Sequence, residues 1–225
     1  PLSRQQIVSL VLEGIHRSQM LEAEVYMQVT RGIAPRNHIF PVGVSAQFAM
    51  TVRSARIVPA EKRQLGISVT VLNDERWANC YVKSLNLLPN VLAKERAMRE
   101  GHYEAIFVRE DNGFVTEGSS SNIFVVKNGV AYTTPATKRI LHGIVRSAVR
   151  QCAEQLNISF VEKDMDVAFL LEADEAFVTS TSVEVLPIAR IDGTTLPNEH
   201  PITNKLQEAY RALVEQSCNN TDQSR

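Results

Sequence analysis

Residues 83–88 read Lys-Ser-Leu-Asn-Leu-Leu, and residues 116–122 read Thr-Glu-Gly-Ser-Ser-Ser-Asn. Each stretch follows a short apolar run that is typical of a strand, which favours an α/β fold with both at strand ends. A lysine amine forms a Schiff base with an aldehyde cofactor, and apolar surroundings disfavour its ammonium form. A carboxylate beside a Gly/Ser-rich turn pairs with a protonated ring nitrogen. Lys83 and Glu117 are therefore candidate ends of one cofactor site.

Each of these two residues also has an ordinary explanation. Most lysines lie in solvent, and a glutamate in a turn commonly faces water. Tyr81 and Val82 before Lys83, and the leucines after it, favour apolar surroundings for the amine. Spacing alone leaves both explanations open.

Two further segments could bind a phosphate. Residues 141–145, Leu-His-Gly-Ile-Val, open an amphipathic helix expected over 144–156, and the first amides of a helix bind anions. Ser180, Thr181 and Ser182 follow an apolar strand and offer hydroxyl groups. Every helix has such a start, and the second segment is also typical of an ordinary turn that ends a strand.

A carboxylate-binding pair is expected in the loop over residues 31–41. An arginine binds a carboxylate through two parallel hydrogen bonds, and Arg36 has His38 two residues away. A solvated loop is the alternative. No His/Cys cluster with metal-ligand spacing occurs in the sequence, and its glycines form no nucleotide-binding motif.

Composition indicates a soluble globular protein. The 225 residues are 44% hydrophobic and 22% charged with a net charge of −1, which favours neither nucleic acid nor a membrane surface as a partner. Cys80, Cys152 and Cys218 form no CxxC motif and no even set, which is typical of the cytoplasm.

Hydrophobic periodicity predicts a mixed α/β chain. Three parts are expected: residues 1–57 as the remainder of a small domain, 58–62 as a linker and 63–225 as a large domain. Asn128-Gly129 predicts a hairpin turn. Helices are expected over 4–17, 90–100, 144–156, 167–171 and 203–217, and strands over 24–30, 47–52, 65–72, 81–83, 103–108, 114–115, 123–126, 130–133, 158–162, 175–179 and 185–191.

The order of these motifs resembles the fold-type IV pyridoxal-phosphate enzymes, and most closely the D-amino acid aminotransferases. The lysine and glutamate stretches, residues 103–105 (Tyr-Glu-Ala), 141–145 and 177–181 (Phe-Val-Thr-Ser-Thr) occur in the family's order. The Pro-Arg-Asn-His run at 35–38 indicates the D-amino acid branch. The resemblance covers about residues 24–193. It implies a small α/β domain followed by a larger mixed-sheet domain with flanking helices.

The resemblance also implies roles for individual residues. Lys83 is the Schiff-base lysine and proton carrier, and Glu117 pairs with the pyridine nitrogen. Arg36 and His38 bind the substrate carboxylate from the other subunit of a homodimer. Further positions implied to bind the cofactor are Leu141, Ile144, Val145, Ser180 and Thr181, and further positions implied near the substrate are Tyr26 and Ser182.

The implied reaction is transamination between a D-amino acid and a 2-oxo acid such as 2-oxoglutarate. The alternatives are an aminodeoxychorismate lyase, a branched-chain aminotransferase, or a truncated member that binds without catalysis. In the family, strands before the equivalent of residue 1 supply an arginine to the phosphate and a tyrosine to the substrate pocket. A chain without them is expected to retain cofactor weakly. Val145 stands where relatives can carry threonine, which would remove one hydroxyl contact to the phosphate.

Overall fold

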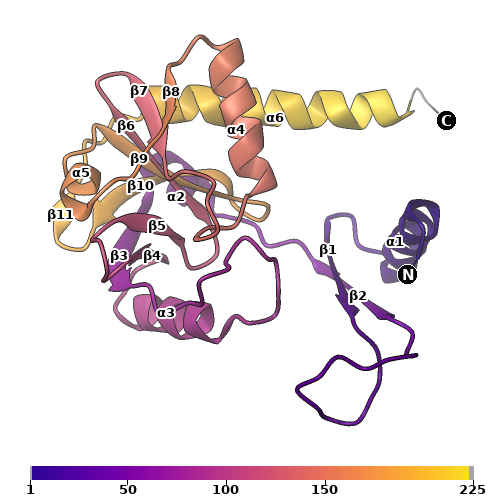
Figure 1. Ribbon diagram of the computed structural model, residues 1–225. Helices are drawn as coiled ribbons and strands as arrows, with labels where there is room; N and C mark the ends of the chain where they lie inside the picture. Colours follow the sequence, from indigo (N-terminus) through magenta and orange to yellow (C-terminus); the bar gives the residue numbers. More distant parts are fainter. Residues whose placement is uncertain (1, 223–225) are drawn as a thin grey trace. The chain divides into compact units, whose positions relative to one another are not determined.

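The protein divides into two compact units, Pro1–Ile57 and Val58–Arg225. The computed structural model describes residues 2–222 (Figure 1). No helix in this range is long and apolar enough to cross a membrane.

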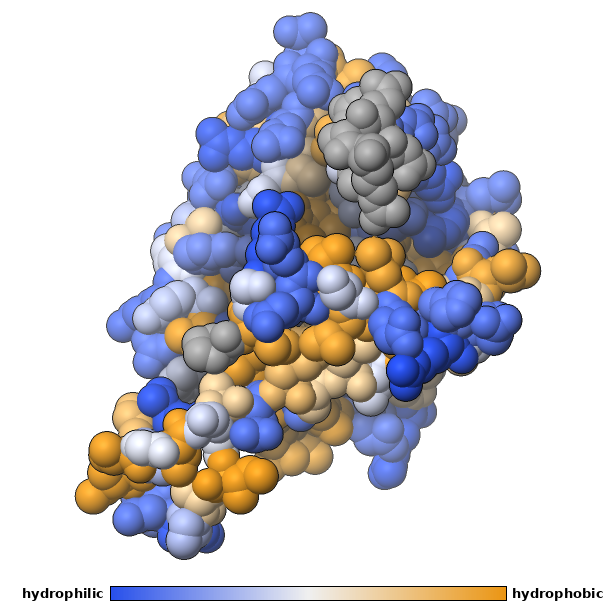
Figure 2. Space-filling model, turned by 90° about the vertical axis from the view of Figure 1, so that its right-hand side faces the viewer, coloured by the Kyte–Doolittle hydropathy of each residue, from blue (hydrophilic) through white to orange (hydrophobic). Residues whose placement is uncertain are grey.

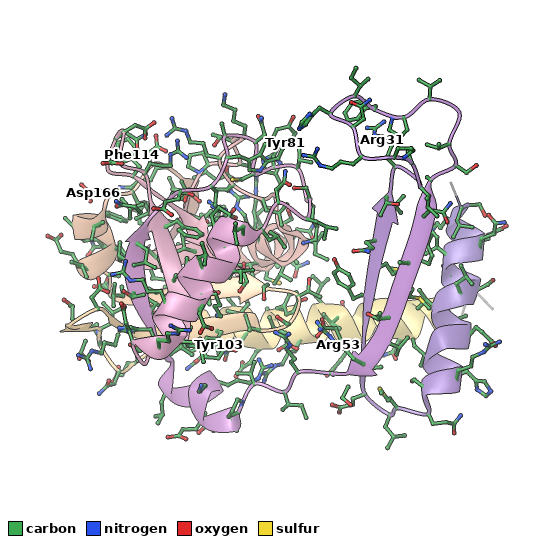
Figure 3. The ribbon with its side chains drawn as sticks, turned by 90° about the horizontal axis from the view of Figure 1, so that it is seen from below. Arg31, Arg53, Tyr81, Tyr103, Phe114 and Asp166 are labelled. Atoms are coloured by element: carbon green, nitrogen blue, oxygen red, sulfur yellow. The ribbon has the colours of Figure 1, made fainter. Side chains whose placement is uncertain are left out.

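The first unit consists of one helix and one hairpin. Helix α1 (Arg4–Ser18) begins with a capping box, in which Ser3 and Gln6 each bond the other's backbone. Strands β1 (Ala23–Thr30) and β2 (Gln47–Ser54) pair antiparallel from Ala23–Ser54 to Thr30–Gln47. The loop over 31–46 therefore closes one end of the hairpin, which Arg31 marks in Figure 3, while Arg53 marks the other end.

The second unit is built on a nine-stranded sheet with the order β5-β4-β3-β10-β9-β6-β7-β8, and β11 pairs with β10. Helices flank the sheet (Figure 1). The strands are β3 (Ile67–Asn73), β4 (Glu104–Val108), β5 (Val115–Gly118), β6 (Asn122–Lys127), β7 (Val130–Thr133), β8 (Phe160–Glu162), β9 (Glu175–Ser180), β10 (Glu184–Ile191) and β11 (Thr194–Thr195). The helices are α2 (Ala60–Leu65), α3 (Leu88–Arg99), α4 (Ile144–Gln155), α5 (Val167–Leu171) and α6 (Pro201–Asp222).

The sheet curls so that its edge strand β5 returns to its central strand β6. A short turn joins the two strands, and the Gly118 amide donates to the Ser121 carbonyl at 2.7 Å across it. The Thr134 hydroxyl, just beyond β7, donates to the Thr116 carbonyl at 2.7 Å. Phe114 and Asp166 form an isolated bridge at the other end of β5 (Figure 3). This closure satisfies backbone groups that an open edge would leave unpaired.

Strand β6 is buried on both faces, which explains its continuous apolar run. Ile123 and Val125 pack into the interior of the curled sheet. Phe124 packs on the opposite face with residues of α4 and α6, and its ring stacks on Phe177 at 4.7 Å between centroids. Burying each of these side chains contributes on the order of 2 kcal/mol. Strand β6 therefore stabilises both hydrophobic cores, the one inside the curled sheet and the one between the sheet and helices α4 and α6.

Most of the predicted elements are confirmed. The Asn128-Gly129 turn joins β6 to β7 with φ angles of 51° and 76°, the left-handed values that a two-residue hairpin turn requires. The short strand β11 was not expected from the sequence.

The strand predicted over 81–83 is wrong. These residues form a turn, in which the Tyr81 amide donates to the Lys138 carbonyl at 3.3 Å and no ladder continues. Tyr81 and Val82 are half exposed, at 51% and 42%. Their apolar character therefore does not reflect a buried strand in this unit.

The stretch 58–62, expected as a linker, carries regular structure. Val58 is buried in the core of the second unit, and α2 begins at Ala60, directly after Pro59. Pro59 is the N-cap of α2, with φ −53° and ψ 140°, so the proline stands directly before a helix.

Candidate active site

Glu117 lies near the end of β5 as a buried carboxylate held by several donors. Its Oε1 accepts from Nη1 of Arg76 at 2.5 Å. Its Oε2 accepts from the Asn122 amide nitrogen at 2.8 Å, and the Leu141 backbone amide lies 3.1 Å from both oxygens. The alternative of a turn carboxylate facing water is therefore wrong for Glu117.

Arg76 is a buried arginine that the sequence reasoning missed. Its Nε and Nη2 donate to the two carboxylate oxygens of Asp74 at 2.8 and 2.9 Å. The Thr116 hydroxyl donates to Asp74 at 2.8 Å and accepts from Arg76 at 3.2 Å. The guanidinium therefore bridges two buried carboxylates, one from the end of β3 and one from β5.

The charges in this cluster do not balance. Burial raises the pKa of Glu117 to about 7, although the charge and hydrogen bond of Arg76 and the Leu141 amide oppose the shift. Burial acts in the same direction on Asp74, but the bonds and charge of Arg76 outweigh it and hold the Asp74 pKa below its ordinary value. One guanidinium cation thus faces two carboxylates. Asp74 is fully paired with it, whereas the negative charge of an ionised Glu117 is not neutralised within the cluster.

The serine turn after Glu117 is fixed by Glu104, a buried carboxylate at the start of β4. Glu104 accepts hydroxyl hydrogen bonds from Ser119, from Ser120 at 2.8 Å and from Ser121 at 3.2 Å. Its Oε1 also accepts from its neighbouring backbone amide at 2.9 Å. One side chain therefore holds all three serines of the turn.

The start of α4 lies beside Glu117. Asn122 donates to Oε2 of Glu117 and, at 2.9 Å, to the Leu141 carbonyl. A Cβ on Gly143 would lie 2.2 Å from Oδ1 of Asn122, so only glycine fits there. Gly143 is the N-cap of α4 and makes no side-chain capping bond, so no side chain caps the amides of the first turn, at Ile144 and Val145.

The segment 180–182 lies at the same end of the central strands. Thr179 pairs with Asn122 across β9 and β6, so the turn that follows β9 begins one residue beyond that pair. The Ser180 hydroxyl is 3.3 Å from the Ser182 hydroxyl, and Thr181 is exposed. Residues 117, 122, 141–145 and 180–182 thus gather around one end of β6.

Lys83 is exposed in the loop over residues 74–87, and the apolar, desolvated environment expected for it is not found in this unit. Within residues 2–222, no hydrogen bond or ion pair engages its amine. Hydrogen bonds nevertheless hold both ends of the loop near Glu117. Arg76 binds Glu117 at one end, and after the other end Asn90 donates to the Ser119 carbonyl at 2.8 Å. Tyr81 marks this loop in Figure 3.

The surface that follows Lys83 is apolar. Leucines and a valine along the end of the loop and the first turns of α3 are more than half exposed, namely Leu85, Leu88, Val91 and Leu92. Elsewhere on the surface, Figure 2 shows apolar side chains exposed among hydrophilic ones on the face that it turns toward the viewer.

The expected carboxylate-binding residues lie in the first unit. Arg36 and His38 are exposed in the loop over 31–46. In the same loop the Arg31 guanidinium lies 3.7 Å from the Phe40 ring centroid. Tyr26 on β1 is 42% exposed and its hydroxyl is 3.3 Å from the Gln28 side-chain oxygen. Arg36 and His38 therefore share one loop, and Tyr26 lies on the strand that leads toward it.

The residues around Glu117 fit pyridoxal phosphate. The excess negative charge of the Asp74–Arg76–Glu117 cluster is suited to a protonated ring nitrogen, which would restore neutrality. The α4 amides without a side-chain cap are suited to a phosphate group. Both features lie beside Leu141, whose backbone amide binds Glu117 and which precedes the helix start by three residues.

Comparison with known proteins supports the same conclusion. Residues 1–191 match the family described as amino-transferase class IV. A D-alanine aminotransferase of Bacillus licheniformis is 41% identical over 215 residues, which cover 94% of this chain and 75% of that protein. One of Staphylococcus epidermidis is 39% identical over 213 residues, with the same coverage. The branched-chain amino acid aminotransferase of Thermobaculum terrenum, solved in its PLP form, superposes with a TM-score of 0.79 at 26% identity, over 95% of this chain and 71% of that one.

The match extends over most of the chain and includes the segments that surround Glu117. The curled mixed sheet with flanking helices is the architecture of the solved relative as well. The chain belongs to the class IV aminotransferases.

Proposed function

We propose that this protein transfers an amino group between a D-amino acid and a 2-oxo acid, with pyridoxal phosphate as cofactor. The observation that carries the proposal is the buried Glu117, whose negative charge the cluster does not neutralise, beside the start of α4, which has no side-chain cap. The names of the similar D-alanine aminotransferases support the D-amino acid as donor.

The bound cofactor would supply an aldehyde that joins to amines and a ring that withdraws electrons from the substrate α-carbon. Glu117 would keep a proton on the ring nitrogen by forming an ion pair with it, because Asn122 and Leu141 hold the carboxylate in a fixed position. The amides of Ile144 and Val145 bind the phosphate, with the hydroxyls of Ser180 and Thr181 nearby in the fold. These residues orient the cofactor and perform no proton transfer at the substrate.

Lys83 carries the reacting amine. Its side chain takes a proton from the substrate α-carbon as a base and, as an acid, would deliver it to the cofactor carbon that carried the aldehyde, so that the amino group stays with the cofactor. An amine that no other side chain engages suits this role, since it must change partners during the reaction. The hydrogen bonds of Arg76 and Asn90 keep the two ends of the Lys83 loop beside the strand that bears Glu117.

Arg36 and His38 bind the substrate carboxylate, with Tyr26 and Ser182 near the substrate. Arginine binds a carboxylate through two parallel bonds, which fixes the orientation of the α-carbon. In this proposal the pair acts within a homodimer, across the boundary between subunits. The assembly is proposed to act in the cytoplasm.

A donor comparison tests the proposal against its alternatives. The purified protein is given cofactor and 2-oxoglutarate, with D-alanine, L-leucine and aminodeoxychorismate as separate donors. D-Alanine is expected to give pyruvate and D-glutamate, and only when 2-oxoglutarate is present. L-Glutamate from L-leucine would instead indicate a branched-chain enzyme, and pyruvate from aminodeoxychorismate without an acceptor would indicate a lyase.

Cofactor attachment is tested separately. Borohydride reduction of the yellow protein should fix the cofactor to the peptide that contains Lys83. A protein that remains colourless with added cofactor would exclude catalysis for this chain.

A further inference from the structure

The arginine that bridges Asp74 and Glu117 suggests a role beyond holding the fold together. A planar guanidinium can bind two carboxylates in different directions at once. Arg76 uses one edge for both oxygens of Asp74 and its remaining terminal nitrogen for Oε1 of Glu117. Its side chain is 5% exposed, and that of Asp74 is fully buried. Such a pair, excluded from water, acts strongly on its neighbours.

The hydrogen bond from Arg76 engages only one of the two carboxylate oxygens of Glu117. Oε1 accepts from the guanidinium, whereas Oε2 accepts from the neutral amide of Asn122. The Leu141 amide is shared equally between the two oxygens. Oε2 therefore keeps more of its capacity to accept a further hydrogen bond, and it is the oxygen on the Asn122 side of the carboxylate.

We propose that Arg76, oriented by Asp74, is a positioning residue that keeps Glu117 ionised, so that the proton between Glu117 and the cofactor's ring nitrogen stays on the nitrogen. This inference rests on the proposed function, since it concerns the same cofactor. The physical reason is proximity: the guanidinium contacts Glu117 directly, so its charge lowers the proton affinity of Glu117 more than that of a ring nitrogen beyond it. Removing the guanidinium moves the proton toward the carboxylate.

The test measures the proton on the ring nitrogen directly. The holoenzyme is prepared with pyridoxal phosphate labelled with ¹⁵N in the ring, because protonated and unprotonated pyridine nitrogens have well-separated ¹⁵N resonances. The wild-type protein is expected to show the protonated form. In Arg76→Gln the ratio of protonated to unprotonated nitrogen should fall at least about tenfold, the change that one pKa unit represents.

Two other variants serve as comparisons. Arg139→Gln is a matched control, because the Arg139 side chain pairs with Asp111 on the surface and only its carbonyl contacts Arg76. It should keep the wild-type resonance. Arg76→Lys retains the charge, but one ammonium cannot bind both oxygens of Asp74 and also Glu117, so an intermediate ratio is expected.

Turnover provides a second measurement. Because the substrate carboxylate is bound elsewhere, Arg76→Gln should lower kcat for D-alanine while leaving KM nearly unchanged. Wild-type protein that fails to bind cofactor would overturn the proposed function itself. Wild-type protein that binds cofactor with an unprotonated nitrogen, or a wild-type resonance in folded Arg76→Gln, overturns only the role of Arg76. Where Arg76→Gln does not fold, Arg76→Met replaces it, since it also removes the charge, and a wild-type resonance in Arg76→Met overturns the role of Arg76 in the same way.

Discussion

Glu117 and Lys83 represent two kinds of region in the second unit. Glu117 is buried and contacted by Arg76, Asn122 and Leu141. Lys83 is exposed and has no such partner within residues 2–222. The part of the site suited to the cofactor ring is thus formed by the folded chain itself, whereas the reacting amine is left free to move. Changes to the first region should alter stability, and changes to the second should alter turnover alone.

The largest effect is expected at the exposed amine. Lys83→Ala should lower kcat by about 10³-fold or more, because general acid–base catalysis by a single group contributes on the order of 10²–10⁴. The midpoint of thermal unfolding should be unchanged, since an exposed side chain is lost. The exposed Lys205→Ala is the matched control, and normal turnover in Lys83→Ala would refute the assignment.

The next largest effect is expected in how the free energy of unfolding of the cofactor-free protein depends on pH. The folded-state pKa of Glu117 is about 7, above its ordinary value of 4.5, so between these values the folded chain holds a proton that the unfolded chain has released. The contribution of Glu117 to stability is therefore fully present below about pH 4.5 and is lost as pH rises through 7, by about 3 kcal/mol in total. Asp74, whose pKa is lowered, acts only at lower pH.

Denaturant unfolding between pH 5 and 8 measures this slope. Glu117→Gln cannot titrate, so its stability should change less with pH across the same window. Equal slopes in the two proteins would show that the buried carboxylate is not the titrating group.

A smaller loss of stability is expected at the carboxylate behind the serine turn. Glu104→Gln replaces one acceptor oxygen with a donor, which leaves serine hydroxyls and the new amide imperfectly paired. The free energy of unfolding should fall by about 2 kcal/mol. Glu172→Gln is the control, because the Glu172 side chain is 69% exposed and pairs with Lys127 on the surface; a similar loss there would argue against a special role for Glu104.

The smallest effect is expected in the first unit. Arg36→Ala should raise KM for D-alanine roughly tenfold, the cost of one charge-assisted interaction, while the absorbance of bound cofactor stays the same. Arg17→Ala, an exposed arginine on α1, should leave KM unchanged. Unaltered kinetics in Arg36→Ala would remove the loop over 31–46 from the site.

The sequence predicted the elements better than it predicted the contacts between them. Alternation and helical spacing located β6, α4 and α5, because burial on defined faces leaves a periodic pattern. The same rule failed for residues 81–83, where apolar side chains lie in a turn. A short apolar run indicates that its side chains are buried from water, but it does not indicate which surface covers them.

Arg76 shows the limit for the site. It stands two residues after Asp74, which was the available signal, but its second partner lies 41 residues further along the chain. Only the curling of the sheet brings the two together. Glu117 and the start of α4 were predictable because strand ends and helix starts have local signatures, whereas a buried ion pair depends on tertiary contact.

The position of Glu117 beside the turn that joins an edge strand to a central strand has a consequence for how the protein matures. The carboxylate, the serine turn and the donors from Asn122 and Leu141 come together only when β5 has folded back against β6. A partly folded chain with an open sheet would lack the ring-binding half of the site. Capture of the cofactor would then follow the completion of the sheet, and its tight binding would stabilise that finished state by mass action. The colour of the bound cofactor would report how many molecules have closed the sheet.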